Sequence, residues 1–328
     1  MCKGGNGIMK FEVTSSPHIR SKNNTQKIML NVILALLPTL LVGVVRFGIQ
    51  AFILTLASVA AAVVAEWICG MAIYHRNTVK DLSSVVTGML LALTLPSTTP
   101  LWVAAIGSVF AIVLVKGFGG RLGKNVFNPA LAARAFLMLL WPVYLIRYPQ
   151  VGTTGNAVDM VAGATPLHHM QMPALPEESF MDMFLGNIGG CIGEVCTLAL
   201  LAGAAYLVWK GIITVRIPAA YLGTVAVLTF IFYKGDNAFA WMMYSLLGGG
   251  VMLGALFMAT DYTTSPVTPK GQVIYGIGCG VLTVVFRYFG LFPEGVTYAI
   301  LLMNACVWVI DAYTAPRRFG TKKGEIAS

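Results

Sequence analysis

One threonine is placed where it could take part in covalent chemistry. The segment Asp159–Leu167 reads Asp-Met-Val-Ala-Gly-Ala-Thr-Pro-Leu, in a polar interruption of an otherwise apolar chain. Gly163 and Ala164 leave space for a large group to approach Thr165, and the proline that follows fixes the next φ angle. The Thr165 hydroxyl is therefore a candidate for esterification, although an ordinary surface turn accounts for the same residues.

Two asparagines form a second candidate site, at the end of a glycine-rich segment. Asn128 precedes Pro129 and suits the N-cap of a helix that begins at that proline. A capped helix after a flexible loop accounts for Asn128 but gives Asn125 no role, and an amide offers a ligand both donors and an acceptor. The hydroxyl-rich segment Asp261–Lys270 fits ligand binding and turn formation equally well.

Ionisable residues inside apolar segments are further candidates. Arg134 and Glu194 each lie about eight residues, or roughly 12 Å, into a hydrocarbon core of ~30 Å. They could approach one another, and we favour a structural ion pair over a place in an ion path. Glu66 lies near the end of its segment, where we expect its carboxylate to reach towards the membrane surface. His168 and His169 have no nearby partners in the sequence and are interpreted as polar loop residues, not metal ligands.

The composition sets the class of protein that positions these residues. Of the 328 residues, 57% are hydrophobic and 11% are charged, whereas soluble domains have about 25% charged residues. The mean hydropathy is +0.77. Six cysteines are scattered without a Cys-x-x-Cys pair, so neither a disulfide framework nor an iron or zinc site is indicated. The chain is predicted to be an all-α polytopic membrane protein.

A span needs roughly 20 apolar residues, and the chain offers ten such segments. The stretch Thr87–Pro100 resembles Gly249–Pro266, because in each a Gly-containing helix end runs into a Thr/Ser/Pro turn. An odd number of spans per half would make two such halves inverted. We therefore predict two inverted five-helix repeats with broken third and eighth segments. The expected spans are about 28–47, 50–74, 82–96, 101–118, 126–145, 188–209, 213–233, 241–260, 272–288 and 296–313.

Lys and Arg orient the chain. With the N-terminus inside, 17 of the 22 Lys and Arg residues fall on the inner side. The net charge of +9 is thus explained by membrane topology, and we expect no nucleic-acid partner. The expected parts are a cytoplasmic segment 1–27, a first repeat 28–146, an extracytoplasmic loop 147–187 that contains Thr165, a second repeat 188–314 and a cytoplasmic tail 315–328.

Four segments together resemble one family over essentially the whole chain. The chain is similar to the D subunit of the Rnf complex, a membrane ferredoxin:NAD oxidoreductase, and to the B subunit of the sodium-pumping NADH:quinone reductase. The resemblance rests on Ser16-Pro17-His18, Gly-Arg-Leu-Gly-Lys-Asn-Val-Phe-Asn-Pro-Ala at 120–130, Asp-x-x-x-Gly-Ala-Thr-Pro-Leu at 159–167 and Met-Ala-Thr-Asp-Tyr-Thr-Thr-Ser-Pro at 258–266.

The resemblance implies two flavins. It implies FMN joined to Thr165 by a phosphoester bond, which a separate magnesium-dependent flavin transferase forms outside the membrane. Asp159, Gly163 and Ala164 match the family motif, whereas Ala162 stands where the family usually has Ser or Thr. The resemblance also implies a noncovalent riboflavin near the inner face, where the matching side chains are Asn125 and Asn128.

The implied function is electron transport in a prokaryotic cytoplasmic membrane, with both termini inside. Electrons would cross the membrane through the flavins, coupled to Na⁺ or H⁺ transport between ferredoxin and NAD. The chain has no context for nucleotide or iron–sulfur binding, so that chemistry would lie on partners (the A, B, C, E and G subunits), and we expect no catalysis from this chain alone. Two alternatives stay open: a transporter similar to urea and ammonium channels on the same scaffold, and a structural membrane protein in contact only with partners and lipid.

Overall fold

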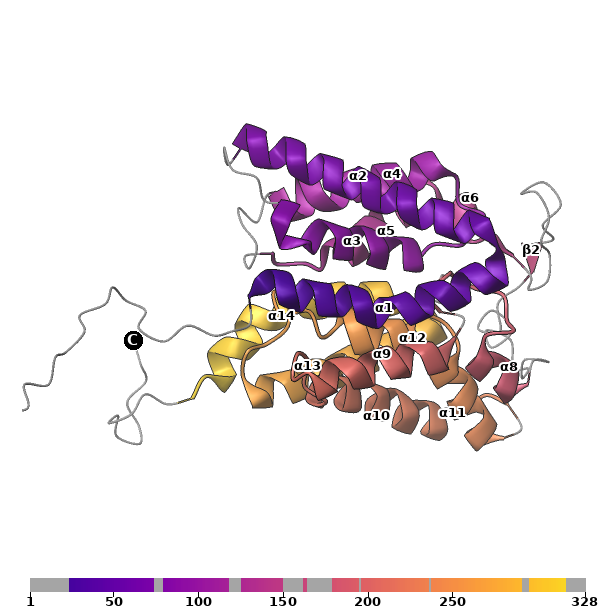
Figure 1. Ribbon diagram of the computed structural model, residues 1–328. Helices are drawn as coiled ribbons and strands as arrows, with labels where there is room; N and C mark the ends of the chain where they lie inside the picture. Colours follow the sequence, from indigo (N-terminus) through magenta and orange to yellow (C-terminus); the bar gives the residue numbers. More distant parts are fainter. Residues whose placement is uncertain are drawn as a thin grey trace, which may run out of the picture.

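The computed structural model is a bundle of helices packed roughly side by side (Figure 1). It describes residues 24–73, 79–117, 125–149, 162–163, 179–194, 196–235, 237–290 and 295–316. The elements of the first half are α1 (Thr25–Phe47), α2 (Ile49–Ile73), the 3₁₀ turn η1 (Val79–Asp81), α3 (Ser83–Leu93), α4 (Leu101–Phe110), the π-helical turn η2 (Ala111–Lys116), α5 (Pro129–Leu140) and α6 (Pro142–Leu145).

The second half repeats this helical character. Its elements are α8 (Phe180–Leu185), α9 (Thr197–Trp209), α10 (Arg216–Ile231), α11 (Ala238–Leu247), α12 (Val251–Leu253), the π-helical turn η3 (Gly254–Met258), α13 (Pro269–Phe289) and α14 (Val296–Thr314). Between the halves, β1 (Tyr148–Pro149) and β2 (Ala162–Gly163) form a two-stranded antiparallel ribbon.

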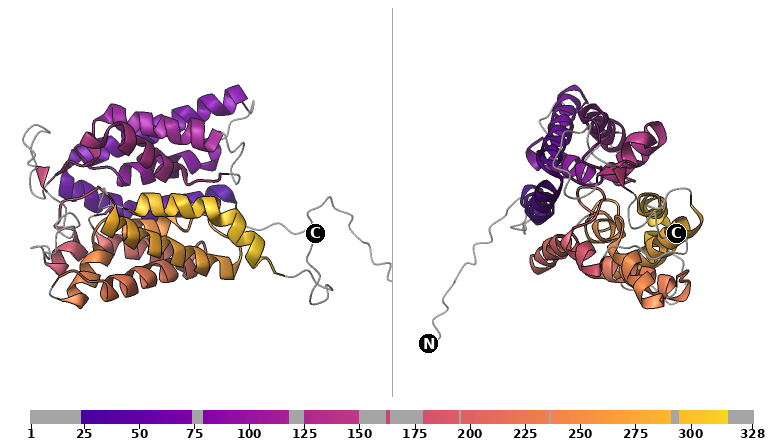
Figure 2. Two further views of the ribbon diagram at one scale, coloured as in Figure 1. Left: turned by 180° about the vertical axis from the view of Figure 1, so that it is seen from behind. Right: turned by 90° about the vertical axis from the view of Figure 1, so that its right-hand side faces the viewer.

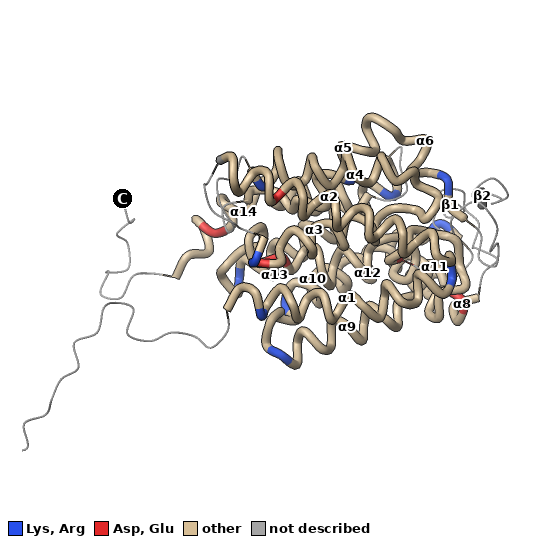
Figure 3. Tube along the Cα trace, turned by 45° about the horizontal axis from the view of Figure 1, so that its top comes forward, with Lys and Arg blue, Asp and Glu red and all other residues tan. Residues whose placement is uncertain are grey.

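The helices confirm a polytopic membrane protein. In the described part, α1, α2, α13 and α14 are long and apolar enough to cross a membrane, and α11 with α12 and η3 forms a fifth candidate bent by 62°. The remaining apolar helices have 10–17 residues. Large apolar side chains point outward along their length, as a lipid-facing surface requires, while charged residues lie mostly towards the two ends (Figure 3).

Two expected spans besides those predicted to be broken are not continuous helices. The expected span 126–145 is interrupted between α5 and α6 at Trp141, because Pro142 lacks an N–H donor and disfavours helical φ and ψ in the residue before it. The expected span 188–209 is helical only from Thr197 onward. Glu194 therefore lies in a turn before α9, and not on a helix as the sequence predicted.

The two halves meet along their first and last helices. Seen along the bundle, the helices gather in two groups, one from each half (Figure 2). The first helix α1 packs along α9, and α14 packs against both α13 and α5. A Cβ at Gly203 of α9 would lie 2.2 Å from the Ala35 carbonyl oxygen of α1, so only glycine permits this close helix contact.

The chain ends and the ribbon lie at opposite ends of the bundle. Helix α1 begins and α14 ends at one end, which we call the terminal end; β2 and α8 lie at the other (Figures 1 and 2). The ribbon pairs Tyr148 with Gly163 and Pro149 with Ala162.

Helix α3 stops inside the bundle, and a buried arginine covers its end. Arg134 of α5, 6% exposed, donates a hydrogen bond from Nη1 to the carbonyl of Thr94, the C-cap residue of α3. Beyond it, the turn before α9 supplies further donors: the Ile192 N–H to Leu95 O at 3.1 Å and the Gly193 N–H to Leu93 O at 2.7 Å. The carbonyls that the helix leaves unpaired thus find donors within the protein.

Helix α11 stops in the same way at Gly248-Gly249-Gly250. Arg287 of α13 donates from Nη1 to Ser245 O at 2.5 Å and from Nη2 to Gly248 O at 2.8 Å. Its side chain is buried. A positive charge at a helix C-terminus is favourable in both cases because it faces the negative end of the helix dipole.

Glu194 lies between the end of α3 and the end of α11. Its Oε1 lies 3.5 Å from Arg134 Nη1, and both side chains are buried. A Cβ at Gly250, just beyond α11, would lie 2.7 Å from this Oε1, so a larger residue there would force the carboxylate to move. The predicted approach of Arg134 and Glu194 is thus present, as an ion pair between the end of α3, the end of α11 and the turn before α9.

The ion pair predicts a specific pattern of stability. Arg134→Leu leaves Glu194 as a buried charge without its partner, and we expect the free energy of unfolding to fall by about 3–5 kcal/mol. Arg134→Leu/Glu194→Gln loses the same contact to Thr94 but leaves no such charge, so it should recover part of that loss. Chemical denaturation in detergent measures the difference, and equal instability of both variants would show that the pair is not energetically coupled.

The helix contact at Gly203 gives a second prediction. Gly203→Ala should lower the unfolding temperature in detergent, corresponding to roughly 1–3 kcal/mol, because the added methyl group collides with the α1 backbone. Gly223→Ala in α10 is the matched control, since a Cβ there meets nothing within 4 Å and alanine favours the helix. An unchanged Gly203→Ala protein would contradict the close packing of α1 on α9.

Candidate functional site

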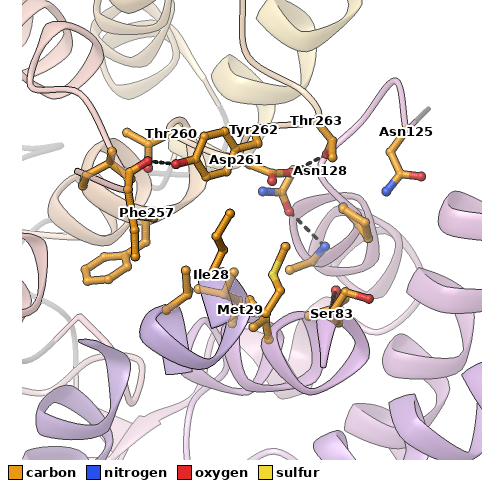
Figure 4. A pocket seen from close by; sticks show the side chains of 18 of the residues that line it. Ile28, Met29, Ser83, Asn125, Asn128, Phe257, Thr260, Asp261, Tyr262 and Thr263 are labelled. Atoms are coloured by element: carbon orange, nitrogen blue, oxygen red, sulfur yellow. Dashed lines mark hydrogen bonds between the residues drawn. The ribbon is translucent and has the colours of Figure 1, made fainter. Parts of the chain in front are cut away.

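A cavity at the terminal end collects residues from both halves of the chain. It contains about 810 Å³ of space free of atoms, part of it open to the surroundings. Ligand pockets are mostly apolar with a few polar groups, and the lining of this cavity has that character. It is lined by Ile28, Met29, Val32, Ser83, Val86, Thr87, Leu90, Lys116, Asn125, Asn128, Pro129, Ala130, Leu207, Ile212, Ile213, Phe257, Thr260, Asp261, Tyr262 and Thr263 (Figure 4).

Two separate sequence motifs meet in its wall. The first, at 125–130, leads into α5, and the second, at 257–263, leaves η3. The Asn128 Nδ2 donates to the Met258 carbonyl at 3.2 Å, which ties the two motifs directly. In the orientation that satisfies its whole amide, Asn304 of α14 accepts from the Asn128 N–H at 3.1 Å and donates to Thr264 O at 3.1 Å. The cavity wall is thus held by buried hydrogen bonds.

The side chain of Asn128 makes hydrogen bonds with backbone groups. Its Oδ1 accepts from the N–H groups of Ala130 at 3.0 Å and Leu131 at 3.3 Å, and Pro129 occupies the first helical position. Asn128 is therefore the N-cap of α5, as the sequence suggested. With both amide atoms engaged, its side chain shapes the cavity but has little capacity left for a ligand.

The side-chain oxygen of Asn125, in contrast, is left to accept a hydrogen bond. Asn125 is 9% exposed and lines the cavity, and its Oδ1 has no hydrogen-bond partner among the described residues. A buried amide oxygen without a partner costs about 1–3 kcal/mol. This cost disappears when a ligand in the cavity donates to it, so Asn125 is the stronger candidate for a ligand contact.

The hydroxyl-rich segment forms a turn and also lines the cavity. Thr263 and Thr264 donate to Asp261 Oδ2 at 2.9 and 3.3 Å, which is turn chemistry, while Asp261 also lines the cavity. Burial raises the pKa of the Asp261 carboxyl above its ordinary value, and the two hydroxyls oppose that rise. Thr268 accepts from the Gly271 N–H and caps α13.

An unforeseen ion pair borders the cavity. Lys116 donates from Nζ to Glu66 Oε2 at 2.5 Å and to Ser83 Oγ at 2.8 Å. Glu66 is 5% exposed, so the expectation that its carboxylate reaches the membrane surface was wrong; pairing with Lys116 allows it to stay buried. An acid and a base near the same end of neighbouring apolar segments was the signal that could have revealed this pair.

The predicted covalent acceptor lies outside the described residues. This holds for Thr165, Asp159 and Ala164, and for His168 and His169. Gly163 is described, in β2 opposite Tyr148, and β2 lies at the end of the bundle away from the cavity. Arg134 and Glu194 belong to neither place, since their pair lies at the helix breaks. No group of three or more His, Cys, Asp or Glu residues in the described part could hold a metal ion.

The cavity can be tested against the flavin that the resemblance implies. A flavin ring is flat and largely apolar, with donors and acceptors along its pyrimidine edge. The cavity offers apolar walls from α1 and α3, the unpartnered Asn125 oxygen, and hydroxyls of Thr260 and Thr263. The residues fit the group: Asn125 would bind its polar edge, while the apolar walls would exclude water from the ring.

Comparison with known proteins identifies the family to which the chain belongs. Residues 12–320 match the model of the "NQR2, RnfD, RnfE family". The chain is 46% identical to the D subunit of the Na(+)-translocating ferredoxin:NAD(+) oxidoreductase complex of Acetobacterium woodii, over 96% of this chain and 97% of the relative. It is 40% identical to the D subunit of the proton-translocating ferredoxin:NAD(+) oxidoreductase complex of Clostridium ljungdahlii, over 95% and 97%.

A more distant relative extends the same match. The D subunit of the ion-translocating oxidoreductase complex of Stutzerimonas stutzeri is 37% identical, over 91% of this chain and 93% of the relative. Both motifs at the cavity, 125–130 and 257–263, lie within the region that matches the family model. The chain therefore belongs to the NQR2, RnfD, RnfE family.

Proposed function

We propose that this chain is the D subunit of an ion-translocating ferredoxin:NAD⁺ oxidoreductase complex and carries electrons across the membrane through two flavins. A noncovalent riboflavin occupies the cavity at the terminal end, and FMN is esterified to Thr165 at the opposite end. The observation that carries the proposal is the buried, unpartnered Asn125 oxygen in a cavity built from two motifs of the family resemblance. The relatives' names support the complex.

The residues of this chain would bind and isolate the flavins, which supply the electron chemistry. Asn125 binds the polar edge of riboflavin, Asn128 holds the wall that Asn125 belongs to, and the apolar walls keep water away. At the other end, Gly163 and Ala164 leave Thr165 accessible to the flavin transferase, and Asp159 completes the motif. The covalent bond keeps FMN in place in every redox state.

The proposed topology has ten spans in two inverted five-helix repeats, with both termini in the cytoplasm. Ten spans bring the termini to one side, and five spans bring the loop after α6 to the other. The positions of α1, α14 and β2 support this arrangement (Figure 1). So do the breaks near α3 and α11, which are the expected third and eighth segments. The partner A, B, C, E and G subunits carry the ferredoxin and NAD chemistry, and Na⁺ or H⁺ transport is coupled to the electron path.

The covalent flavin can be detected directly. We expect a fluorescent band near 35.1 kDa on a denaturing gel of protein coexpressed with the flavin transferase. Thr165→Ala should abolish the fluorescence, and mass spectrometry should find the added nucleotide on the peptide with Thr165. Thr165→Ser, which keeps a hydroxyl, is the control. An unmodified peptide from the native complex would reject this half of the proposal.

Substitutions of the two asparagines should have different effects, one on riboflavin binding and the other on the stability of the protein. We expect Asn125→Ala to weaken riboflavin binding by about tenfold, which corresponds to the roughly 1.4 kcal/mol of one hydrogen bond, with no loss of thermal stability. Asn128→Ala should instead cost about 1 kcal/mol of stability through the lost helix cap.

Equilibrium dialysis with riboflavin and thermal unfolding measure the two effects, on protein made without the transferase. If Asn125→Ala binds riboflavin as the parent does, the contact assigned to Asn125 is wrong.

A further inference from the structure

The Lys116–Glu66 ion pair lies beside the cavity with its lysine facing the cavity. Among the described residues, those that line the cavity include Lys116 and Ser83 but not Glu66. The positive end of the pair therefore faces the cavity, and the negative end lies behind it. Lys116 is 8% exposed and lies at the end of the π-helical turn η2, which packs against α2, and its side chain reaches Ser83 of α3.

Burial of this pair is not explained by stability. Replacing a buried ion pair with well-packed apolar residues is often neutral or stabilising, because removing two charges from water is costly. Here Glu66 and Ser83 occupy two of the three N–H donors of Lys116, which holds the ammonium in one position. One donor and the positive charge are left for a group in the cavity.

We propose that Lys116 is a positioning and tuning residue that raises the redox potential of the flavin bound in the cavity. The proposal rests on the proposed function of this cavity. A flavin ring that takes up two electrons and one proton gains one negative charge, and a fixed cation at its side stabilises that charge. With two protons the ring stays neutral and the cation has little effect, so the size of the shift also reports the proton count.

Opposite charge on the far side limits this field but does not cancel it. Asp261 also lines the cavity, and its carboxylate accepts hydrogen bonds from Thr263 and Thr264. Lys116 has its acid behind it and away from the cavity, whereas the Asp261 charge is already stabilised by two donors on its own turn. The side of the cavity formed by α3 and η2 is therefore the positive one.

The test measures two affinities of riboflavin for the full chain made without the flavin transferase. One is the dissociation constant of oxidised riboflavin, and the other is that of riboflavin reduced by dithionite under anaerobic conditions. Relative to the parent protein, Lys116→Gln should weaken binding of the reduced form by about tenfold more than binding of the oxidised form. For a two-electron couple, that ratio lowers the potential by about 30 mV. Lys116→Arg keeps the charge and should keep the ratio.

Two further variants control for an effect of net charge and for a failure to fold. Lys80→Gln removes the same charge from the exposed turn η1 at the same end and should leave the ratio unchanged. Glu66→Gln/Lys116→Gln leaves no unpaired charge in the interior, so it should fold even if Lys116→Gln does not, and it should shift the ratio in the same direction.

The outcomes separate the two proposals. Riboflavin bound by Lys116→Gln and by the double variant with the parent's ratio would overturn the role of Lys116 while leaving the cavity as a flavin site. A Lys80→Gln shift as large as that of Lys116→Gln would also overturn it, because the effect would then be one of net charge. A parent protein that binds riboflavin in neither redox state would instead reject the proposed function of the cavity.

Discussion

The requirement that every backbone polar group inside a membrane has a partner within the protein governs this structure. Two helices, α3 and α11, stop within the bundle and leave carbonyls that water cannot reach. Arg134 and Arg287 supply donors to these carbonyls, and Glu194 offsets part of their charge. Charged residues that are costly in lipid are acceptable here because each has an assigned partner. The breaks and the buried charges therefore depend on one another.

The break after α11 also helps to form the cavity. Because α11 ends early, the chain turns through Gly248–Gly250 and continues as α12 and η3 at an angle, which delivers Met258 and Asp261 to the start of α5. Asn128 then bonds both to its own helix and to Met258, so the wall combines parts 130 residues apart in sequence. A straight eighth helix would bring no such loop to Asn125. The turns η2 and η3 are both π-helical, and π-helical turns are frequent at functional sites.

Much of this could be predicted from local patterns. Hydropathy located the apolar segments, and the Asn-Pro pair identified the start of α5, because both signals act over a few residues. The interruptions at Trp141 and before Thr197 could not be located so well, since apolar residues also fill non-helical segments when protein surrounds them. The burial of Glu66 was missed for a related reason. A charge near the end of an apolar segment is expected to reach the surface, and only the tertiary structure brings Lys116 from another helix to pair with it.

The arrangement also bears on what the scaffold can do. A channel needs a continuous path, but the space between the halves near the breaks is small, about 260 Å³, and is lined by Arg134, Glu194 and Met258. A guanidinium that bonds the end of α3 and pairs with Glu194 cannot leave without exposing both partners. The structure thus holds its two halves together at the point where a transporter of similar design would have to open. Its spare binding capacity lies instead in the cavity with Asn125, at one end of the bundle, which favours a resident ligand over a passing solute.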